Sequence, residues 1–277
     1  MLLATVLALS AAVLHAGWNL VAKRAEGDRY MVLWAQFFVG GVVSVPFLVA
    51  SHLWWGMPAE AYLWAALSGS VHLPYTWLLA RAYTVGDFSV SYPIARGGGA
   101  ALAAIGGVVA LGDSLTGTEA AGIVIVVTGL SMLAYRAGTR ELGMALLVAL
   151  TIGLYTTFDA KGARVTESIV YIFASFAATA VTNTAFALGT GRRREMVAVL
   201  RTAWRRTLLT GMASLVTYGM VLVAVRYASV GYVASLRESS VVIASLAGWR
   251  LLGEADHRRR LAAAGVVFTG LLVLVAG

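Results

Sequence analysis

The chain has 277 residues, of which 60% are hydrophobic and 12% charged, with a net charge of +8 and a mean hydropathy of +0.81. A soluble domain needs more polar surface than this, so the composition excludes soluble enzymes and nucleic-acid-binding proteins. Apolar residues fill consecutive positions in segments such as 120–133, which excludes the alternating strands of a β-barrel. Cysteine is absent, so there is no disulfide framework and no thiolate metal site, and we expect neither a metal nor a cofactor.

Apolar runs between charged and turn residues predict ten transmembrane helices, because about 20 residues cross a bilayer. In chain order they are expected at residues 2–22, 30–51, 61–80, 88–111, 118–135, 142–160, 168–189, 207–225, 230–252 and 261–276. The first run has no positively charged start and nine runs follow it, so we interpret it as a helix and not as a cleaved signal peptide. The predicted fold class is an all-α polytopic membrane protein.

Basic residues are distributed unevenly between the two sides of these helices. Sixteen of the 21 Lys and Arg residues fall on the side of the first, third, fifth, seventh and ninth loops, and three fall on the other side. The remaining two, Arg96 and Arg237, lie inside predicted helices. Because Lys and Arg are enriched in cytoplasmic loops, we expect non-cytoplasmic termini and a cytoplasmic arginine-rich segment at 192–206.

The two halves of the chain share motifs in the same order. Their pairs are Ala22-Lys23 with Ala160-Lys161, Leu111-Gly112-Asp113 with Leu252-Gly253-Glu254, Gly122 with Ala263, and Gly129 with Gly270. The offsets of 138 and 141 residues predict two five-helix repeats, residues 1–138 and 139–277. Since five is odd, the second repeat crosses the membrane in the opposite sense, as in carriers that work by alternating access.

Four of the predicted helices carry motifs that resemble the EamA-type members of the drug/metabolite transporter superfamily. These are His15 to Asn19 with Lys23, Tyr92 to Gly97, Tyr155 to Asp159, and Leu236 to Ser240. The resemblance covers essentially the whole chain and includes both Leu-Gly-acid turns. It implies ten helices in two inverted repeats around a central cavity, in a protein of the bacterial inner membrane that exports amino acids or related metabolites.

Polar residues inside predicted helices point to the substrate pathway, because a polar group at membrane depth needs a partner or a wet cavity. His15, Trp18 and Asn19 are spaced to share one helix face, although Asn19 is equally suited to bonding a neighbouring helix. His72 and Tyr75 are one turn apart and flank Pro74. We interpret both faces as candidate cavity walls.

Charged residues are the most informative candidates for substrate binding. Arg96 lies about eight residues inside its helix, one turn from Tyr92. Alignment of the two Gly-acid turns places Arg96 opposite Glu238, which follows Arg237 and precedes Ser239. These groups are suited either to an ion pair between helices or to binding the carboxylate and ammonium of a zwitterionic substrate.

The same region combines a proline with three consecutive glycines. Pro93 removes a backbone hydrogen bond, and Gly97, Gly98 and Gly99 permit either bending or close helix packing. We interpret these four residues as a candidate hinge.

Aromatic residues complete the predicted cavity: Trp18, Tyr75, Trp77, Tyr92, Tyr155 and Tyr218. Asp159 lies at the predicted end of its helix, two residues before Lys161, so we expect it to be solvated at the membrane surface.

The leading functional hypothesis is a secondary transporter that exports small metabolites, foremost amino acids, by alternating access. The alternatives are an exporter of drugs or cationic metabolites and, from another class, an intramembrane lipid-modifying enzyme. No P-loop, H-E-x-x-H or G-x-S-x-G motif is present, so the chain has neither an ATP site nor a recognised hydrolase site. Its expected partners are a small-molecule substrate and membrane lipid, with no nucleic acid, and the expected working unit is a monomer.

Overall fold

A computed structural model describes residues 1–23, 27–85, 88–133, 138–166, 170–240, 243 and 257–276. Side chains are described in this range except those of residues 18–23, 83–85, 88–93, 133 and 257–261. All regular elements in the described chain are helices, eleven in number. They are α1 (Leu2–Lys23), α2 (Arg29–Trp55), α3 (Ala59–Val85), α4 (Phe88–Leu111), α5 (Gly117–Leu133), α6 (Thr139–Val165), α7 (Val170–Gly189), α8 (Arg193–Thr202), α9 (Trp204–Ala224), α10 (Val230–Arg237) and α12 (His257–Ala276).

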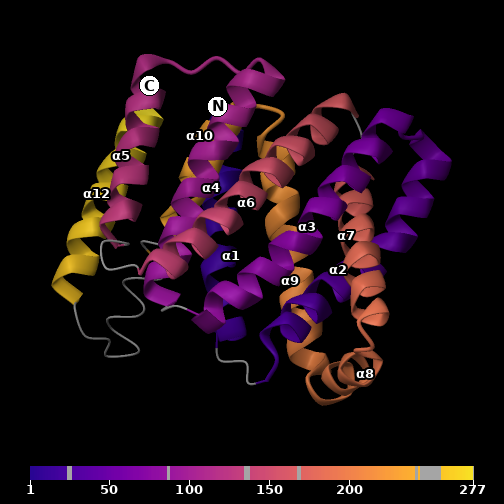
Figure 1. Cartoon of the computed structure of the whole chain (residues 1–277). Coiled ribbons are helices and arrows are strands. Elements are labelled where there is room, and N and C mark those ends of the chain that lie inside the picture. Colours follow the sequence, from indigo (N-terminus) through magenta and orange to yellow (C-terminus); the bar gives the residue numbers. More distant parts are fainter. Residues whose placement is uncertain are drawn as a thin grey trace.

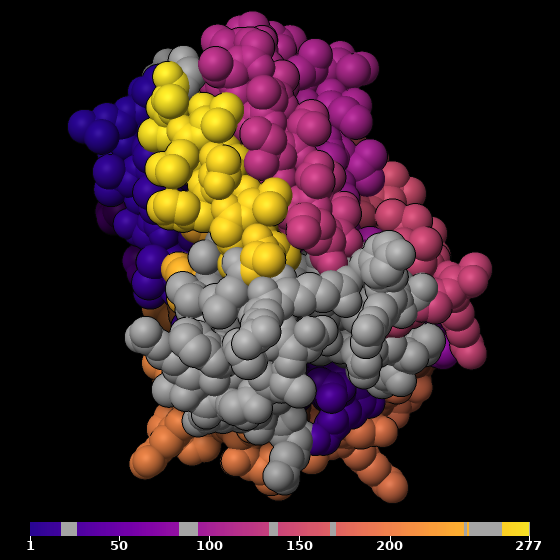
Figure 2. Space-filling view, turned by 90° about the vertical axis from the view of Figure 1, so that its left-hand side faces the viewer, coloured from indigo at the N-terminus to yellow at the C-terminus, as the bar shows by residue number. Residues whose placement is uncertain are grey.

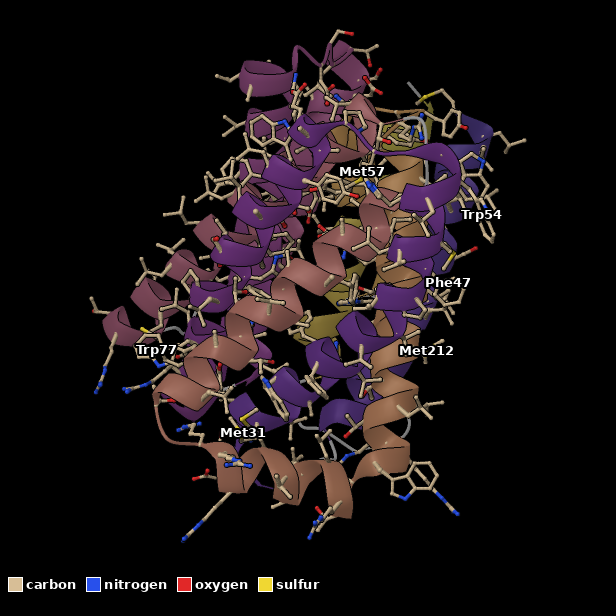
Figure 3. The ribbon with its side chains drawn as sticks, turned by 90° about the vertical axis from the view of Figure 1, so that its right-hand side faces the viewer. Met31, Phe47, Trp54, Met57, Trp77 and Met212 are labelled. Carbon is tan, nitrogen blue, oxygen red and sulfur yellow. The ribbon has the colours of Figure 1, made fainter. Side chains whose placement is uncertain are left out.

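Among the residues that the structure describes, five helical segments are long and apolar enough to cross a membrane. They are Arg29–Trp55, Ile94–Leu111, Thr139–Val165, Val170–Gly189 and Trp204–Ala224. Large apolar side chains such as Phe47 and Trp54 point away from the bundle, with 53% and 75% of their surfaces exposed (Figure 3). Lipid hydrocarbon, and not water, suits such a surface.

The long helices run up and down, so the two chain ends lie at one end of the bundle and α8 lies at the other (Figure 1). Nine of the ten expected runs correspond to long helices within a few residues of the predicted bounds. The expected helix at 230–252 begins with α10, and the part of it at 241–242 and 244–252 lies outside the described residues.

The helix α8 was not expected from the sequence. It occupies the arginine-rich segment that we interpreted as a loop, and its residues Met196, Val199 and Leu200 pack against α2 and α7. Their i, i+3, i+4 spacing gives the helix one apolar face, while its arginines, Arg193, Arg194 and Arg201, lie at other positions. That spacing is the signal that could have predicted α8.

The two halves of the chain are packed into each other and share one core. The main contacts of α1, α2, α4 and α5 include helices of the second half: α9 for α1, α7 and α9 for α2, α6 for α4, and α12 for α5. Figure 2 shows α12 lying directly along α5. A methyl group at Gly122 would lie 2.9 Å from the Gly270 carbonyl oxygen, and one at Gly270 would lie 3.0 Å from that of Gly122. Gly122 and Gly270 face each other, and their lack of side chains allows the backbones of α5 and α12 to approach closely.

Candidate functional site

A polar cavity lies between the helices of the two halves. The empty space between its lining side chains amounts to about 570 Å³, counting the part open to solvent. Residues from α1, α2, α3, α4, α6, α7, α9 and α10 line it: His15, Gln36, Phe37, His72, Tyr75, Arg96, Tyr155, Ser175, Phe176, Thr179, Ser214, Thr217, Tyr218 and Arg237. Such a concave site with a few convergent polar groups is typical of small-molecule binding.

An ion pair between α4 and the end of α10 adjoins this cavity. Arg96 donates from Nη2 to Glu238 Oε1 at 2.6 Å, and both residues are buried. The structure therefore forms the ion pair that the sequence suggested as one alternative. It joins the first half of the chain to the second across the cavity wall, and Arg96 still faces the cavity.

Arg237 is a second buried guanidinium on the cavity, and its environment differs from that of Arg96. Only 6% of its surface is exposed, and its Nε has no hydrogen-bond partner. Its guanidinium carbon lies 5.8 Å from the centre of the Tyr218 ring. Arg237 pairs with no carboxylate in the described part of the chain. A buried charge without a counterion is unfavourable, so this position is suited to an anionic group from a ligand.

Aromatic rings form one wall of the cavity. The ring centre of His72 lies 4.1 Å from that of Tyr155, which is 5.2 Å from Tyr75 and 6.3 Å from Tyr218. His72 Nδ1 donates to the Ser68 carbonyl oxygen at 2.9 Å, which fixes the ring on α3. The rings therefore give a rigid apolar surface with hydroxyl groups at its edge.

The structure corrects the expectation for Asp159. The sequence predicted a solvated residue at the membrane surface, but α6 continues to Val165 and Asp159 is completely buried. Its carboxylate accepts hydrogen bonds from three hydroxyl groups: Tyr171 at 2.7 Å, Ser175 at 3.0 Å, and Tyr218. Since Ser175 and Tyr218 line the cavity, Asp159 lies directly behind its wall.

The expectation for Trp77 was also wrong. Its side chain is 40% exposed and lies at a separate hollow near α8, lined partly by Arg29, Arg81 and Arg192. The Arg81 guanidinium lies 4.7 Å from the Trp77 ring centre, and Trp77 points outward in Figure 3. A cation–π contact at a helix end is a better description of this residue than cavity lining.

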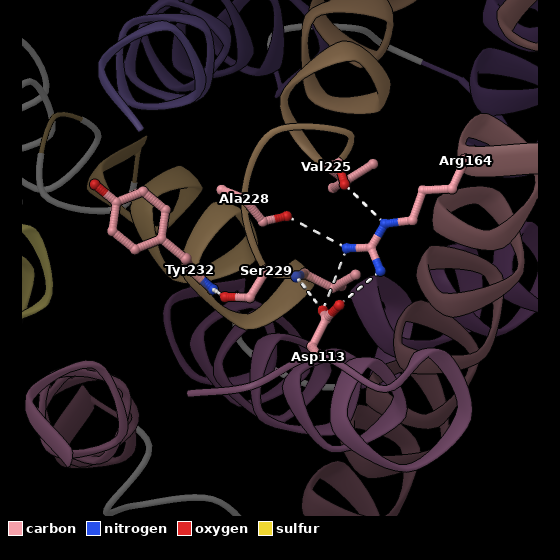
Figure 4. A network of polar contacts seen from close by, with 7 residues as sticks. Asp113, Arg164, Val225, Ala228, Ser229 and Tyr232 are labelled. Atoms are coloured by element: carbon pink, nitrogen blue, oxygen red, sulfur yellow. Dashed lines mark hydrogen bonds and ion pairs between the residues drawn. The ribbon is translucent and has the colours of Figure 1, made fainter. Parts of the chain in front are cut away.

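A network of polar contacts joins the halves (Figure 4), at the end of the bundle opposite α8 (Figure 1). Arg164 of α6 donates to Asp113 at 2.6 and 3.3 Å and to the carbonyl oxygens of Val225 at 2.8 Å and Ala228 at 3.3 Å. Asp113 also accepts from the Val230 backbone N–H at 2.7 Å. One carboxylate and one guanidinium thus connect the α4–α5 turn, α6 and the α9–α10 loop.

The Leu-Gly-Asp turn explains how Asp113 reaches this network. Gly112 adopts a φ of +73°, a left-handed conformation that favours glycine, and the Asp113 N–H bonds to the Gly107 carbonyl oxygen at 3.0 Å. This bond turns the chain back onto the last turns of α4 and pairs a carbonyl group near the helix end. Ser229 caps α10 by accepting from the Tyr232 N–H, so both chain turns at the network are fixed locally.

We expect Arg164→Gln to lower the free energy of unfolding by about 1.5–3 kcal/mol, because it removes charge-assisted hydrogen bonds and leaves two carbonyl groups without their donor. Reversible unfolding in mixed micelles measures this loss. Arg201→Gln, an exposed change on α8, is the control and should have little effect. Equal stability of the two variants would contradict a structural role for the network.

The three consecutive glycines of α4 are packing positions in this structure. Added methyl groups would lie 2.9 Å from Leu130 Cβ at Gly97, 2.9 Å from Ala149 Cβ at Gly98 and 2.5 Å from Ile152 Cγ2 at Gly99. The helix α4 continues through them to Leu111. The close approach of α4 to α5 and α6 therefore requires small residues here.

Seven of the predicted binding residues lie together on the cavity: His15, His72, Tyr75, Arg96, Tyr155, Tyr218 and Arg237. Glu238 reaches it through Arg96, and Ser239 is not among the lining residues. The side chains of Trp18, Asn19, Tyr92 and Pro93 lie outside the described residues.

Sequence reasoning missed several lining residues, although their spacing carried a signal. Ser214, Thr217 and Tyr218 occur at i, i+3 and i+4 on α9, and Ser175 and Thr179 are four apart on α7. Hydroxyl residues at these intervals share one helix face. Such a face in an otherwise apolar helix predicts a polar environment, even when no residue is charged.

An all-helical bundle with lipid-suited surfaces and a buried polar cavity defines a polytopic membrane protein. Residues 139–276 match the EamA-like transporter family. The chain belongs to this family, and it is therefore an integral membrane protein and a membrane transporter of the drug/metabolite type.

Comparison with solved structures supports the fold over both halves of the chain. Twenty-nine solved chains match it. One of them, titled only "Crystal structure of protein", has a TM-score of 0.71 and 16% sequence identity, covering 99% of this chain and 97% of that one. At this identity the likeness concerns the fold alone. No curated protein matches the sequence significantly.

Proposed function

We propose that this protein is a secondary transporter that exports small zwitterionic metabolites, foremost amino acids, by alternating access. The observation that carries the proposal is the buried Arg237 guanidinium, which faces the cavity without a carboxylate partner in the described chain. A guanidinium presents forked donors that match a carboxylate. A substrate carboxylate would supply the missing counterion.

The remaining lining of the cavity supports a small substrate with both polar and apolar parts. Tyr75, Tyr155 and the His72 ring offer an apolar wall, whereas Ser175, Thr179 and Thr217 offer hydroxyl groups. Two guanidinium groups and only one paired carboxylate, Glu238, adjoin the cavity. Asp159 lies behind the wall, so of the charged side chains only the two guanidinium groups of Arg96 and Arg237 are among the described lining residues. Their position on the lining favours an anionic group on the substrate over a purely cationic drug or metabolite. The proposal takes a monomer as the working unit in the lipid bilayer.

The helix contacts support two inverted repeats, residues 1–138 and 139–277, as the basis of alternating access. If α1 to α5 correspond in order to α6, α7, α9, α10 and α12, each major contact has a counterpart of the same kind. The contact of α1 with α9 corresponds to that of α6 with α3, and the contact of α4 with α6 corresponds to that of α10 with α1. In the same way, α3 with α7 corresponds to α9 with α2, and α4 with α5 to α10 with α12. The contacts of α2 with α7 and of α5 with α12 map onto themselves. The Asp113–Arg164 network would then close one end of the pathway.

Pro93 with Gly97, Gly98 and Gly99 belongs to the same proposal as a hinge of α4. Gly98 and Gly99 pack closely against Ala149 and Ile152 in this structure. We expect this contact between α4 and α6 to change when the two repeats move relative to each other.

The distribution of arginines supports an orientation in the bacterial inner membrane with the α8 end in the cytoplasm and both termini outside. Single cysteines test this cleanly because the chain has none of its own. We expect Ala59→Cys, at the end opposite α8, to react with an impermeant thiol reagent on intact cells. Arg193→Cys, at the start of α8, should react only after the cells are opened. The reverse pattern would overturn the proposed orientation.

Counterflow in proteoliposomes tests the proposed substrate class. Vesicles loaded with one unlabelled amino acid should accumulate the same labelled amino acid transiently, without any ion gradient. The amide and the decarboxylated amine of each amino acid are matched controls, since they lack the carboxylate. We expect exchange of amino acids and not of the controls. Exchange of the amine alone would favour the cationic alternative instead.

A further inference from the structure

Asp159 is a buried titratable group that the proposed binding of substrate leaves unused. None of its surface is exposed, and it lies six residues before the end of α6, or about 9 Å along the helix axis. An ionisable residue inside a membrane helix is unfavourable unless it is paired, and it often marks a proton or ion pathway. Asp159 forms no ion pair in the described part of the chain.

Within the described part of the chain, the hydrogen bonds to the Asp159 carboxylate come from hydroxyl groups. Tyr171 and Ser175 of α7 donate to Oδ1 at 2.7 and 3.0 Å, and Tyr218 of α9 donates to Oδ2. Tyr155 of α6 and His72 of α3 are further titratable groups close enough to interact electrostatically with this carboxylate. Among the described residues, no lysine or arginine forms an ion pair with Asp159.

This arrangement suits a proton better than a metal ion. Calcium and magnesium take about six or more oxygen ligands, whereas one carboxylate and three hydroxyl groups surround this position. Among the residues that the structure describes, no cluster of three His, Cys, Asp or Glu side chains exists. A hydroxyl group both donates and accepts, so Ser175 or Tyr218 can turn to accept from a protonated Asp159 without leaving a polar atom unbonded.

The cavity gives a proton a route to this carboxylate. Ser175 and Tyr218 both line the cavity and bond to Asp159. In the outward transfer, the carboxyl group gives its proton to one of these hydroxyl oxygens, which releases its own hydrogen to cavity water. The balance is one proton moved from Asp159 to water, with no other reactant.

Tyr218 also links Asp159 to the proposed substrate site. Its hydroxyl bonds to Asp159, while the Arg237 guanidinium lies 5.8 Å from its ring centre. A zwitterion with its carboxylate at Arg237 can direct its ammonium group toward the Asp159 side of the ring. The ionised carboxylate attracts that ammonium, and protonation removes the attraction.

We propose that Asp159 is the proton-binding site of this transporter and that it couples export to proton entry. The coupling rests on the proposed function. Because linkage is reciprocal, a substrate that binds better when Asp159 is ionised must in turn favour release of the proton. Substrate and proton then occupy the carrier alternately, and the proton gradient drives export.

Two transport assays on the same proteoliposomes test the coupling. In the wild type, a pH gradient should drive accumulation of the amino acid that exchanges best, and a substrate gradient should move protons that an internal pH dye detects. We expect Asp159→Asn to retain counterflow and to lose both gradient-linked signals by about tenfold or more. Glu195→Gln makes the same carboxylate-to-amide change at an exposed position of α8, so it should retain both signals.

Infrared spectroscopy of the purified wild-type protein supplies a readout that needs no substrate. The chain has 13 Asp and Glu residues, so the Asp159 signal is taken from the difference between wild-type and Asp159→Asn spectra. Lowering the pH should raise a protonated-carboxyl band in this difference; if Asp159→Asn does not fold, Tyr218→Phe should shift the pH midpoint of one component of the wild-type band. Failure of counterflow with the infrared band present would refute the amino-acid substrate and retain the proton site. Absence of the band, or gradient-driven accumulation by Asp159→Asn, would overturn the proton site.

Discussion

Replacing Arg237 with methionine is expected to abolish amino-acid exchange while the protein remains at least as stable as the wild type. Removal of one partner of a buried charge pair weakens binding by about 2–5 kcal/mol, or about 30-fold or more in affinity. In the absence of substrate the guanidinium has no carboxylate partner in the described chain, so an apolar side chain of similar length removes an unfavourable burial. Counterflow and melting temperature, measured on one preparation, give the two results.

Two further variants make the Arg237 result specific. Arg237→Lys keeps the charge but loses the forked donors, so its exchange should lie between those of the wild type and the methionine variant. Arg201→Met removes an exposed arginine from α8 and should leave exchange unchanged. A methionine variant that unfolds at a much lower temperature would instead indicate that Arg237 supports the fold.

The Arg96–Glu238 ion pair is expected to show the opposite behaviour, with large losses of stability from single changes. Arg96→Met or Glu238→Met leaves one charge buried without the partner that now lies 2.6 Å away. Such a change typically costs about 3–5 kcal/mol. The double variant removes both charges and should recover a large part of that loss. Unfolding of all four proteins in mixed micelles gives the coupling energy.

Strict additivity of the two losses would show that Arg96 and Glu238 do not stabilise each other. Transport by a folded double variant tests whether Arg96 has a second role in binding the substrate, in addition to its role in stability. If Arg96 also contacts substrate from the cavity wall, exchange remains low although the protein is stable.

The long helices could be predicted because each is an apolar run bounded by charged or turn residues. The prediction was less successful where a helix carries polar residues near its end. The run at 142–160 stopped at the Asp159-Ala160-Lys161 segment, yet α6 continues to Val165 because Arg164 is bonded to Asp113 and two carbonyl groups. A single sequence does not reveal that partner, since it lies 51 residues away.

Site residues could be predicted where burial of their charge is unfavourable. They were missed where their role depends on contacts with residues distant in sequence. Arg96 and Arg237 were identified because a charge deep inside a membrane helix is unfavourable without a partner, and because both lie in motifs that resemble those of a transporter family. Asp159 was assigned to the surface because its three hydroxyl partners come from α7 and α9, distant in sequence. Trp77 was assigned to the cavity because its spacing does not show which way α3 faces.

Binding of the best-exchanged amino acid to purified protein, measured by isothermal titration calorimetry, tests the central claim that Arg237 holds the substrate carboxylate. The wild type should bind the amino acid and not its amide, and Arg237→Met should bind neither, with an affinity for the amino acid lower by about 30-fold or more. Equal affinities of the wild type and Arg237→Met for the amino acid would contradict the account.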